Sequence, residues 1–229
     1  MYKMINSMDF EQARFNMVEQ QVRPWDVLDP RVLDVISEIP REAFIPDNQK
    51  NLAYADTRIL LGSYEGHPCR MLNPNIEGRL LQALEIDDDD TVLEIGTGSG
   101  YLTACLARLS RHVDSVDIDP NMTAMAGKNL AAQNVSNFTL STGDAAEGWS
   151  EQKPCYDVIA ITASMTAVPM AYKKMLKTGG RLFVIRGEAP VMKAMLITRI
   201  GKDEWREEEL FETSVDPLIN AEPKQQFVF

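Results

Sequence analysis

A chain of 229 residues is long enough for one large domain, or for a domain with an appendage, around a substantial buried core. Its 23 Lys and Arg residues against 34 Asp and Glu residues give a net charge of −11, which repels nucleic acid and anionic membranes, so we expect neither as a partner. The three cysteines, Cys69, Cys105 and Cys155, are far apart and only 2 histidines occur, so we expect no disulfide framework, no metal site, and a reducing, cytoplasmic location.

The N-terminal part of the chain predicts two short helices. Over residues 10–22 the apolar side chains recur mostly at helical spacing, until Pro24 ends the run. Asp29 then suits the N-cap of a second helix and Pro30 its first position, and this helix ends before the proline-bounded segment 40–46. We interpret these elements as a small helical extension in front of the main fold.

Residues 51–75 have no regular hydrophobic period and predict a long loop. A loop of this length in a compact domain is usually functional or mobile. A helix is predicted over residues 76–84, and the four aspartates at 87–90 form a polar turn that leads into the first strand of the main fold.

The stretch from Val92 to Tyr101 predicts a strand, a tight turn and a helix. An apolar run of strand length ends in Gly96, Gly98 and Gly100, and a helix is predicted over residues 101–109. Glycines are needed where a turn uses backbone angles that a Cβ would penalise, and where a ligand lies against the main chain. The spacing G-x-G-x-G is not the G-x-G-x-x-G of dinucleotide sites, and no phosphate-loop Gly-Lys-Ser/Thr follows. This favours a nucleoside ligand without a pyrophosphate.

Two acids follow at the ends of the next two predicted strands. Asp117 closes the apolar run 113–116 and is placed to accept hydrogen bonds from ribose hydroxyls, and Asp144 follows the strand 138–140. Either acid alone is more often a solvated loop residue or a helix cap, but the glycine turn and both acids occur in the order and spacing of an S-adenosylmethionine site. The predicted cofactor-binding residues are Glu94, Gly96, Thr97, Gly98, Ser99, Tyr101, Asp117, Ile118, Gly143, Asp144, Ala145 and Thr162.

The alternation of strands and helices continues toward the C-terminus. Strands are predicted over 156–162, 181–185, 195–200 and 210–215, with a helix over 170–176 that Gly179 and Gly180 end, and a turn at 201–203. This order predicts an α/β fold, a Rossmann-like class I methyltransferase with a mostly parallel seven-stranded sheet, an antiparallel final strand and helices on both faces. We expect residues 79–229 to form the S-adenosylmethionine-binding domain, with the helical segment and substrate loop of residues 1–78 packed on it as one compact unit.

Several segments resemble one known family, the protein-L-isoaspartate (D-aspartate) O-methyltransferases. Residues 39–46, Ile-Pro-Arg-Glu-Ala-Phe-Ile-Pro, resemble that family's V-P-R-E-x-F-V-P, and residues 52–56 resemble its L-A-Y-x-D. Residues 92–101 match its V-L-E-I-G-T-G-S-G-Y, and the pair Gly148-Trp149 follows in order. The likeness runs from about residue 15 to residue 218, nearly the whole chain.

The resemblance implies an S-adenosylmethionine-dependent O-methyltransferase that releases S-adenosylhomocysteine as the product of its cofactor. It implies an isoaspartyl carboxylate, in a protein or peptide, as the methyl acceptor. The methyl ester would collapse to a succinimide and so repair the damaged chain. We expect a monomer or a dimer.

One short segment departs from the family pattern. Where the family carries T-I-S-Q-P, with hydroxyls thought to hold the acceptor's carboxylate, this chain has Arg70-Met71-Leu72-Asn73-Pro74. The substrate-loop candidates are therefore Arg70, Leu72 and Asn73, and no catalytic residue is assigned. Leu72 cannot donate a hydrogen bond, whereas Arg70 either binds a carboxylate from inside the site or faces the solvent.

Three hypotheses about function follow from this departure. The first is an isoaspartyl methyltransferase with a rebuilt substrate loop. The second is a methyltransferase of the same fold that acts on another acceptor, such as a small molecule. The third is a cofactor-binding regulatory or interaction module without catalysis, which the intact glycine turn and its two acids disfavour.

Overall fold

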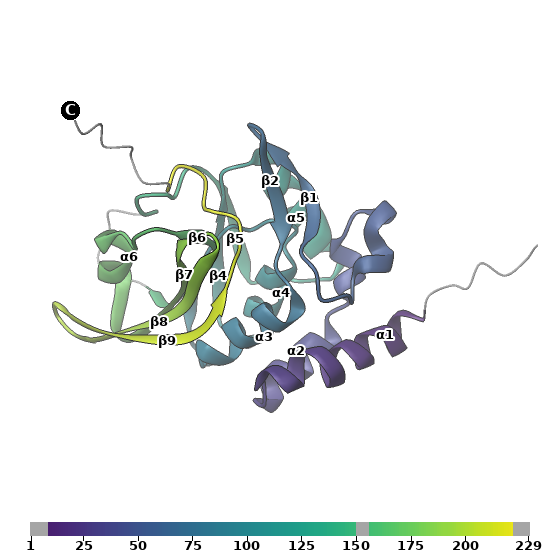
Figure 1. Ribbon diagram of the computed structural model, residues 1–229, viewed down its shortest axis with the longest axis horizontal. Coiled ribbons are helices and arrows are strands. Elements are labelled where there is room, and N and C mark those ends of the chain that lie inside the picture. Colours follow the sequence, from purple (N-terminus) through teal and green to yellow (C-terminus); the bar gives the residue numbers. More distant parts are fainter. Residues whose placement is uncertain (1–8, 150–155, 222–229) are drawn as a thin grey trace, which may run out of the picture.

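The computed structural model describes residues 9–149 and 156–221. Its main strands are β3 (Thr91–Ile95), β4 (His112–Asp117), β5 (Phe138–Thr142), β6 (Tyr156–Met165), β7 (Leu176–Glu188), β8 (Val191–Gly201) and β9 (Glu204–Thr213). They form one seven-stranded sheet in the spatial order β5-β4-β3-β6-β7-β8-β9 (Figure 1). Strands β3 to β7 run parallel, and β8 and β9 form an antiparallel hairpin along β7. The predicted Rossmann-like fold class is confirmed.

Helices cover both faces of the sheet, and the central strands are therefore apolar on both sides. In β3, Val92 packs in one hydrophobic cluster, whereas Leu93 and Ile95 pack in another. The first cluster draws on the helices α2 (Pro30–Glu38), α3 (Pro74–Ala83), α4 (Tyr101–Leu109) and α5 (Pro120–Ala132). On the opposite face, α6 (Met170–Met175) contributes Tyr172 and Met175 to the second cluster.

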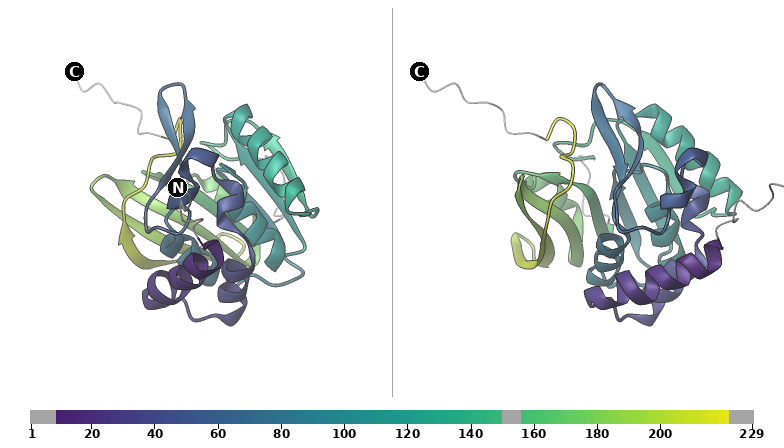
Figure 2. Two further views of the ribbon diagram at one scale, coloured as in Figure 1. Left: turned by 90° about the vertical axis from the view of Figure 1, so that its right-hand side faces the viewer. Right: turned by 45° about the vertical axis from the view of Figure 1, so that its right-hand side comes forward.

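The N-terminal extension is helical, as predicted. Its elements are α1 (Phe10–Met17), the π-helical turn η1 (Val18–Val22), and the 3-10 helices η2 (Arg23–Trp25), η3 (Arg41–Phe44) and η4 (Asp47–Leu52). Asp29 caps α2 by accepting a hydrogen bond from the amide of Arg31 at 2.8 Å, and Pro30 opens that helix. In Figure 2 the purple helix α1 lies at the bottom of both views, far from the tip of the hairpin described next.

A single hydrophobic cluster joins the extension to the sheet. It contains Met17 and Val22 from the N-terminal helices together with Val113 and Phe183 from the strands. The predicted division between residues 78 and 79 falls inside α3. That division stays a prediction about the organisation of the chain.

The prediction of a long loop over residues 51–75 is wrong. Part of this stretch forms an antiparallel hairpin of β1 (Ile59–Tyr64) and β2 (His67–Met71). Glu65 and Gly66 form its turn with φ angles of 49° and 85°, the left-handed conformation that suits the twist of a two-residue hairpin. The alternation of buried and exposed side chains is weak, and Pro68 lies within β2. Neither strand therefore carries a clear sequence signal.

Gly179 and Gly180 do not end helix α6, contrary to the prediction, but lie inside β7. The helix already ends at Met175. The ladder between β6 and β7 shifts register at this level, so the glycines occupy an irregular part of the strand, and Gly179 has a φ of 85°. A glycine pair marks either a helix end or a bulge, and sequence alone does not distinguish the two.

Three further observations concern the described parts of the chain. Within residues 9–149 and 156–221, no helix is long and apolar enough to cross a membrane. In the same ranges, no three His, Cys, Asp or Glu side chains lie together as ligands for a metal ion. Cys69 and Cys105 carry free thiols, and Cys155 lies outside the described residues.

Candidate active site

The glycine turn after β3, called the cradle below, leaves no room for a side chain at Gly96. Gly96, Gly98 and Gly100 all have positive φ angles, of 95°, 53° and 85°. A Cβ on Gly96 would lie 2.2 Å from the hydroxyl oxygen of Thr162. That hydroxyl bonds the carbonyls of Ile95 and Gly96 at 3.0 Å each, so the end of β6 fixes the turn. The main chain is thereby exposed to a ligand at a fixed position.

Asp117 lies at the end of β4, directly beside the glycine turn. Its carboxylate accepts hydrogen bonds from the amides of Gly98 and Asp119, both at 2.9 Å. Burial raises the pKa of Asp117, although the amide of Gly98 opposes the shift. Since each carboxylate oxygen accepts more than one hydrogen bond, the side chain retains acceptor capacity toward a ligand hydroxyl.

A first cavity, with about 990 Å³ of empty space open to solvent, lies over this turn. The predicted cofactor residues that line it are Gly96, Gly98, Asp117, Ile118, Gly143, Asp144, Ala145 and Thr162. A second cavity with about 320 Å³ of empty space is lined by the predicted residues Thr97, Ser99 and Tyr101 together with Glu77. Eleven of the twelve predicted cofactor-binding residues therefore line one or the other of these two cavities.

Asp144 contacts the C-terminal segment 214–221. It is exposed, and its carboxylate accepts hydrogen bonds from the amide of Ala146 and from the side chain of Asn220, both at 2.9 Å. The segment is held on β6 by two backbone hydrogen bonds that join Ser164 to Asp216 and Leu218. Its residues 215–219 also line the first cavity, which the sequence did not predict because no motif marks them.

Glu94 lines neither of these two cavities, although it precedes the glycine turn. The side chain is fully buried, and one of its oxygens accepts hydrogen bonds from Thr103 at 2.5 Å and Ser115 at 2.6 Å. The other oxygen has no hydrogen-bond partner among the described residues. Burial raises the pKa of Glu94 to about 8, against the two hydroxyl hydrogen bonds that lower it. Burial thus favours the protonated form of this carboxyl, whose hydrogen bonds tie α4 to β3 and β4.

This buried carboxyl predicts a specific dependence of stability on pH. An unfolded glutamate titrates near 4.5 and the folded one near 8, so between these values the folded state binds more protons than the unfolded state. Stability therefore falls as the pH rises from 5 to 8, by at most about 1.4 kcal/mol per pH unit for one group. Urea denaturation of Glu94→Gln over this range should show a clearly smaller slope. The exposed Glu212→Gln is the control, and an equal slope in both variants would contradict the prediction.

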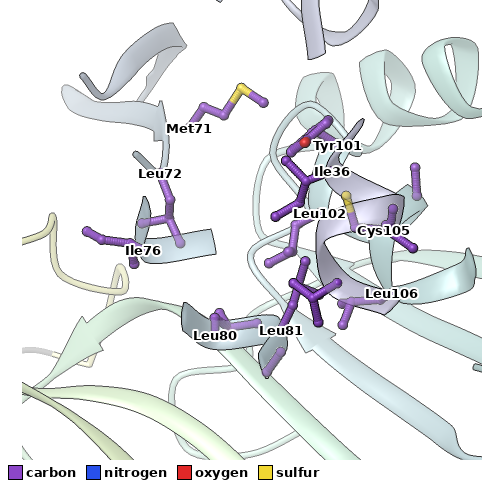
Figure 3. Packing of buried hydrophobic residues seen from close by; sticks show 14 of the residues in the cluster. Ile36, Met71, Leu72, Ile76, Leu80, Leu81, Tyr101, Leu102, Cys105 and Leu106 are labelled. Carbon is purple, nitrogen blue, oxygen red and sulfur yellow. The ribbon is translucent and has the colours of Figure 1, made fainter. Parts of the chain in front are cut away.

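The three substrate-loop candidates have different environments. Arg70 lines both cavities and donates to the carboxylate of Asp216 at 2.8 Å. Leu72 also lines both cavities but is only 6% exposed and is directed toward Ile76 of α3 (Figure 3). Asn73 lines neither cavity and donates to Asp56 at 2.8 Å. Arg70 and Leu72 therefore line the same cavities as the glycine turn, and Asn73 does not.

A buried ion pair fixes the main chain of this loop. Arg41, which is fully buried, pairs with the carboxylate of Glu77 and donates to the carbonyl oxygen of Leu72 at 2.6 Å. Its guanidinium also lies over the ring of Tyr101, 4.9 Å from the centroid. Burial raises the pKa of Glu77 to about 7, and the charge of Arg41 opposes this shift. Sequence reasoning missed both charged residues, since nothing in the local pattern marks a buried charge.

The parallel sheet, the glycine cradle and the acid at the end of β4 together define an S-adenosylmethionine-dependent methyltransferase of the Rossmann-like class. A sequence model of the family described as Protein-L-isoaspartate(D-aspartate) O-methyltransferase matches residues 13–221. The chain belongs to this family, as its motifs predicted.

Individual relatives agree with this assignment. A protein-L-isoaspartate O-methyltransferase of Rhodopseudomonas palustris is 34% identical over 92% of this chain and 94% of its own length. One from Protochlamydia amoebophila is 36% identical, over 90% of this chain and 96% of its own.

Two solved structures share the fold. A protein-L-isoaspartate O-methyltransferase superposes with a TM-score of 0.76 at 24% identity, covering 90% of this chain and 65% of the other. A Plasmodium falciparum chain assigned to the same activity, in complex with S-adenosyl-L-homocysteine, gives a TM-score of 0.73 at 19% identity, covering 91% and 97%.

Proposed function

We propose that this chain is an S-adenosylmethionine-dependent protein-L-isoaspartate O-methyltransferase that methylates the carboxylate of isoaspartyl residues in proteins or peptides. The observation that carries the proposal is the position of the substrate loop. Arg70 and Leu72 line the same two cavities as Gly96 and Gly98. A methyl acceptor bound at this loop would therefore lie next to the cofactor. The likeness to curated relatives over more than nine-tenths of the chain supports the same activity.

The residues present fit the cofactor. A glycine turn that lines the first cavity, next to the acceptor oxygens of Asp117, suits a ribose against the main chain. Ile118, Asp144 and Ala145 would hold the adenine side of the first cavity. When bound, S-adenosylmethionine supplies a methyl carbon activated by a sulfonium charge.

The protein's own contribution is alignment and the exclusion of water. An isoaspartyl carboxylate is already an anion, so it attacks without a general base. Leu61 and Leu72 present apolar surface to both cavities, which keeps water from competing near the reacting groups. Whatever fixes the carboxylate beside them therefore determines the rate.

The test is transfer of labelled methyl from S-adenosylmethionine to an isoaspartyl peptide, with the aspartyl peptide of the same sequence as control. Selective labelling of the isoaspartyl peptide is the expected result. Cofactor binding measured in parallel with no labelling of either peptide would overturn the proposal.

A small-molecule acceptor is the second candidate function, because the loop position expected to carry a hydroxyl is the buried Leu72. Labelling of small carboxylic acids in the same assay, with no labelling of the peptide, would favour it. For either acceptor we propose a cytoplasmic monomer or dimer that does not bind nucleic acid, supported by the net charge of −11 and the free thiols of Cys69 and Cys105.

Restoring a hydroxyl to the loop by Leu72→Ser is expected to raise the rate of isoaspartyl methylation. The new hydroxyl would donate a hydrogen bond to the acceptor's carboxylate. It should also cost roughly 2–4 kcal/mol of stability, because a 6% exposed leucine is lost from the cluster with Ile76 and Leu80. Leu72→Ala is the matched control, since it opens the same space without a donor. Equal methylation rates in the two variants would show that the hydroxyl has no role.

Asp117→Ala is expected to weaken S-adenosylhomocysteine binding by roughly ten-fold to a hundred-fold. The change removes a charged acceptor worth about 1.5–3 kcal/mol, and it also frees the amide of Gly98 in the cradle. Titration calorimetry measures the affinity, with the exposed Asp203→Ala in the β8–β9 turn as control. Unchanged affinity in Asp117→Ala would refute the placement of the ribose.

A further inference from the structure

Two arginines share one carboxylate where the hairpin meets the C-terminal segment. Arg70 on β2 pairs with one oxygen of Asp216 at 2.8 Å, and Arg58, just before β1, lies 3.3 Å from the other oxygen. All three side chains are about one-third exposed. Figures 1 and 2 show the hairpin and the C-terminal segment side by side. Together with Asp216, this arginine pair therefore carries one net positive charge, in a protein whose overall charge is −11.

The arginine pair has unused hydrogen-bond donors. The nearer terminal nitrogen of Arg58, Nη1, is buried, yet it makes no hydrogen bond to any of the described residues. Its contact with Asp216 is an ion pair without hydrogen-bond geometry. Each guanidinium carries five N–H donors, so a single carboxylate leaves most of them free for another acceptor. A buried, charged donor without an acceptor points to a missing ligand at this place.

Three cavities meet at this pair. Arg58, Arg70 and Asp216 line the first cavity, which contains the cofactor cradle, and Arg70 lines the second. A third cavity, with about 810 Å³ of empty space, extends from Arg58 and Asp216 along the ends of β6, β7 and β8. A group held by the two arginines is thus next to the cradle, with room for an attached chain on the other side.

We propose that Arg58 and Arg70 together bind the carboxylate of the methyl acceptor, that Asp216 holds the two guanidiniums in position, and that the acceptor's peptide chain lies in the third cavity. The inference rests on the proposed function and names the groups that recognise its substrate. One added carboxylate brings the cluster of two guanidiniums and Asp216 to neutrality. Arginine suits this role because its planar fork matches carboxylate geometry.

Other acids nearby do not compete for the same place. Asp117 and Asp144 belong to the first cavity and are engaged with backbone amides there, and Glu188 lines the third cavity at the end of β7. A hydrogen bond to one lone pair of a carboxylate oxygen leaves another lone pair for the methyl carbon, so binding by arginine is compatible with attack.

The test compares two peptides that differ only in the acceptor group, an isoaspartyl peptide and its isoasparaginyl analogue with a neutral amide. Calorimetry uses protein loaded with S-adenosylhomocysteine, so that binding is measured without turnover. We expect the wild type to bind the carboxylate peptide at least ten-fold more tightly, and Arg58→Gln/Arg70→Gln to bind the two within about two-fold of each other. Arg70→Lys should keep part of the preference, because it retains the charge and loses the fork.

The control is Arg206→Gln on the exposed face of β9, which should leave the preference intact. The double variant should keep its affinity for S-adenosylhomocysteine within two-fold, which shows that it is folded. A wild type that does not distinguish the peptides, or a double variant that still does, would overturn the inference.

Methyl transfer is measured separately, so that failure of the proposed function can be distinguished from failure of the arginine site. Selective peptide binding without transfer would refute the proposed function and leave the arginine site standing. Transfer by the wild type with an unchanged KM in the double variant would refute the arginine site and leave the function standing.

Discussion

Gly96→Ala is expected to lower the affinity for S-adenosylhomocysteine more than a hundred-fold. A Cβ here would lie 2.2 Å from the hydroxyl of Thr162, and the residue has a φ of 95°, where side chains are strained. Relief requires Thr162 to move, which breaks its hydrogen bonds to the carbonyls of Ile95 and Gly96. The cradle would then lose both its shape and its support. Titration calorimetry measures the loss.

Two controls separate the contributions to this loss. Gly179 has a φ of 85°, and no atom lies within 4 Å of an added Cβ. Gly179→Ala therefore introduces strain without a clash, and it should bind S-adenosylhomocysteine normally. In Gly96→Ala/Thr162→Ala the nearest clashing atom is removed, and partial recovery relative to Gly96→Ala is expected. Full affinity in Gly96→Ala itself would mean that the main chain at this turn does not contact the cofactor.

Arg41→Met is expected to cost about 3–5 kcal/mol of stability, because it leaves the carboxylate of Glu77 buried and unpaired. It also removes the donor to the carbonyl of Leu72. Arg41→Met/Glu77→Met should recover most of the loss, since two apolar side chains of similar size replace a pair that is costly to desolvate. Urea denaturation of the two variants, compared at one pH, measures the difference.

The matched control is Arg23→Met. Arg23 forms an exposed i,i+4 pair with Glu19, and its removal should cost less than about 1 kcal/mol. A loss for Arg41→Met as small as that for Arg23→Met would show that the buried pair contributes little to the folded state.

The cofactor side of the site could be predicted because its signals are local. Alternating glycines after an apolar run indicate the turn at Gly96, and the strand period places Asp117 at the neighbouring strand end. The parallel register of β3 and β4 then brings the two together without any further information. The N-cap of α2 at Asp29 followed from a local signal in the same way.

The proposed acceptor side could not be predicted because its contacts join distant parts of the chain. Arg70 and Asp216 are separated by 146 residues, and Arg41 and Glu77 by 36. No rule of sequence spacing predicts charge pairs over such separations. These charges come together only because the hairpin and the C-terminal segment pack against the sheet. The hairpin itself was missed because Pro68 and a weak alternation hide it. Glu94 was expected to face the cofactor, whereas its side chain is directed toward Thr103 and Ser115.

Arg41 fixes the main chain of the substrate loop through a hydrogen bond to the carbonyl oxygen of Leu72. The position of the loop and the choice of acceptor therefore depend on different groups. Every amino acid supplies the same main-chain carbonyl at position 72, so the anchor is indifferent to the side chains that the loop carries. On the proposed function, an exchange at position 70 would change the choice of acceptor while the main chain at position 72 stays bound to Arg41. Such a loop offers protein engineers a place to graft new acceptor specificities onto an intact methyl-transfer site.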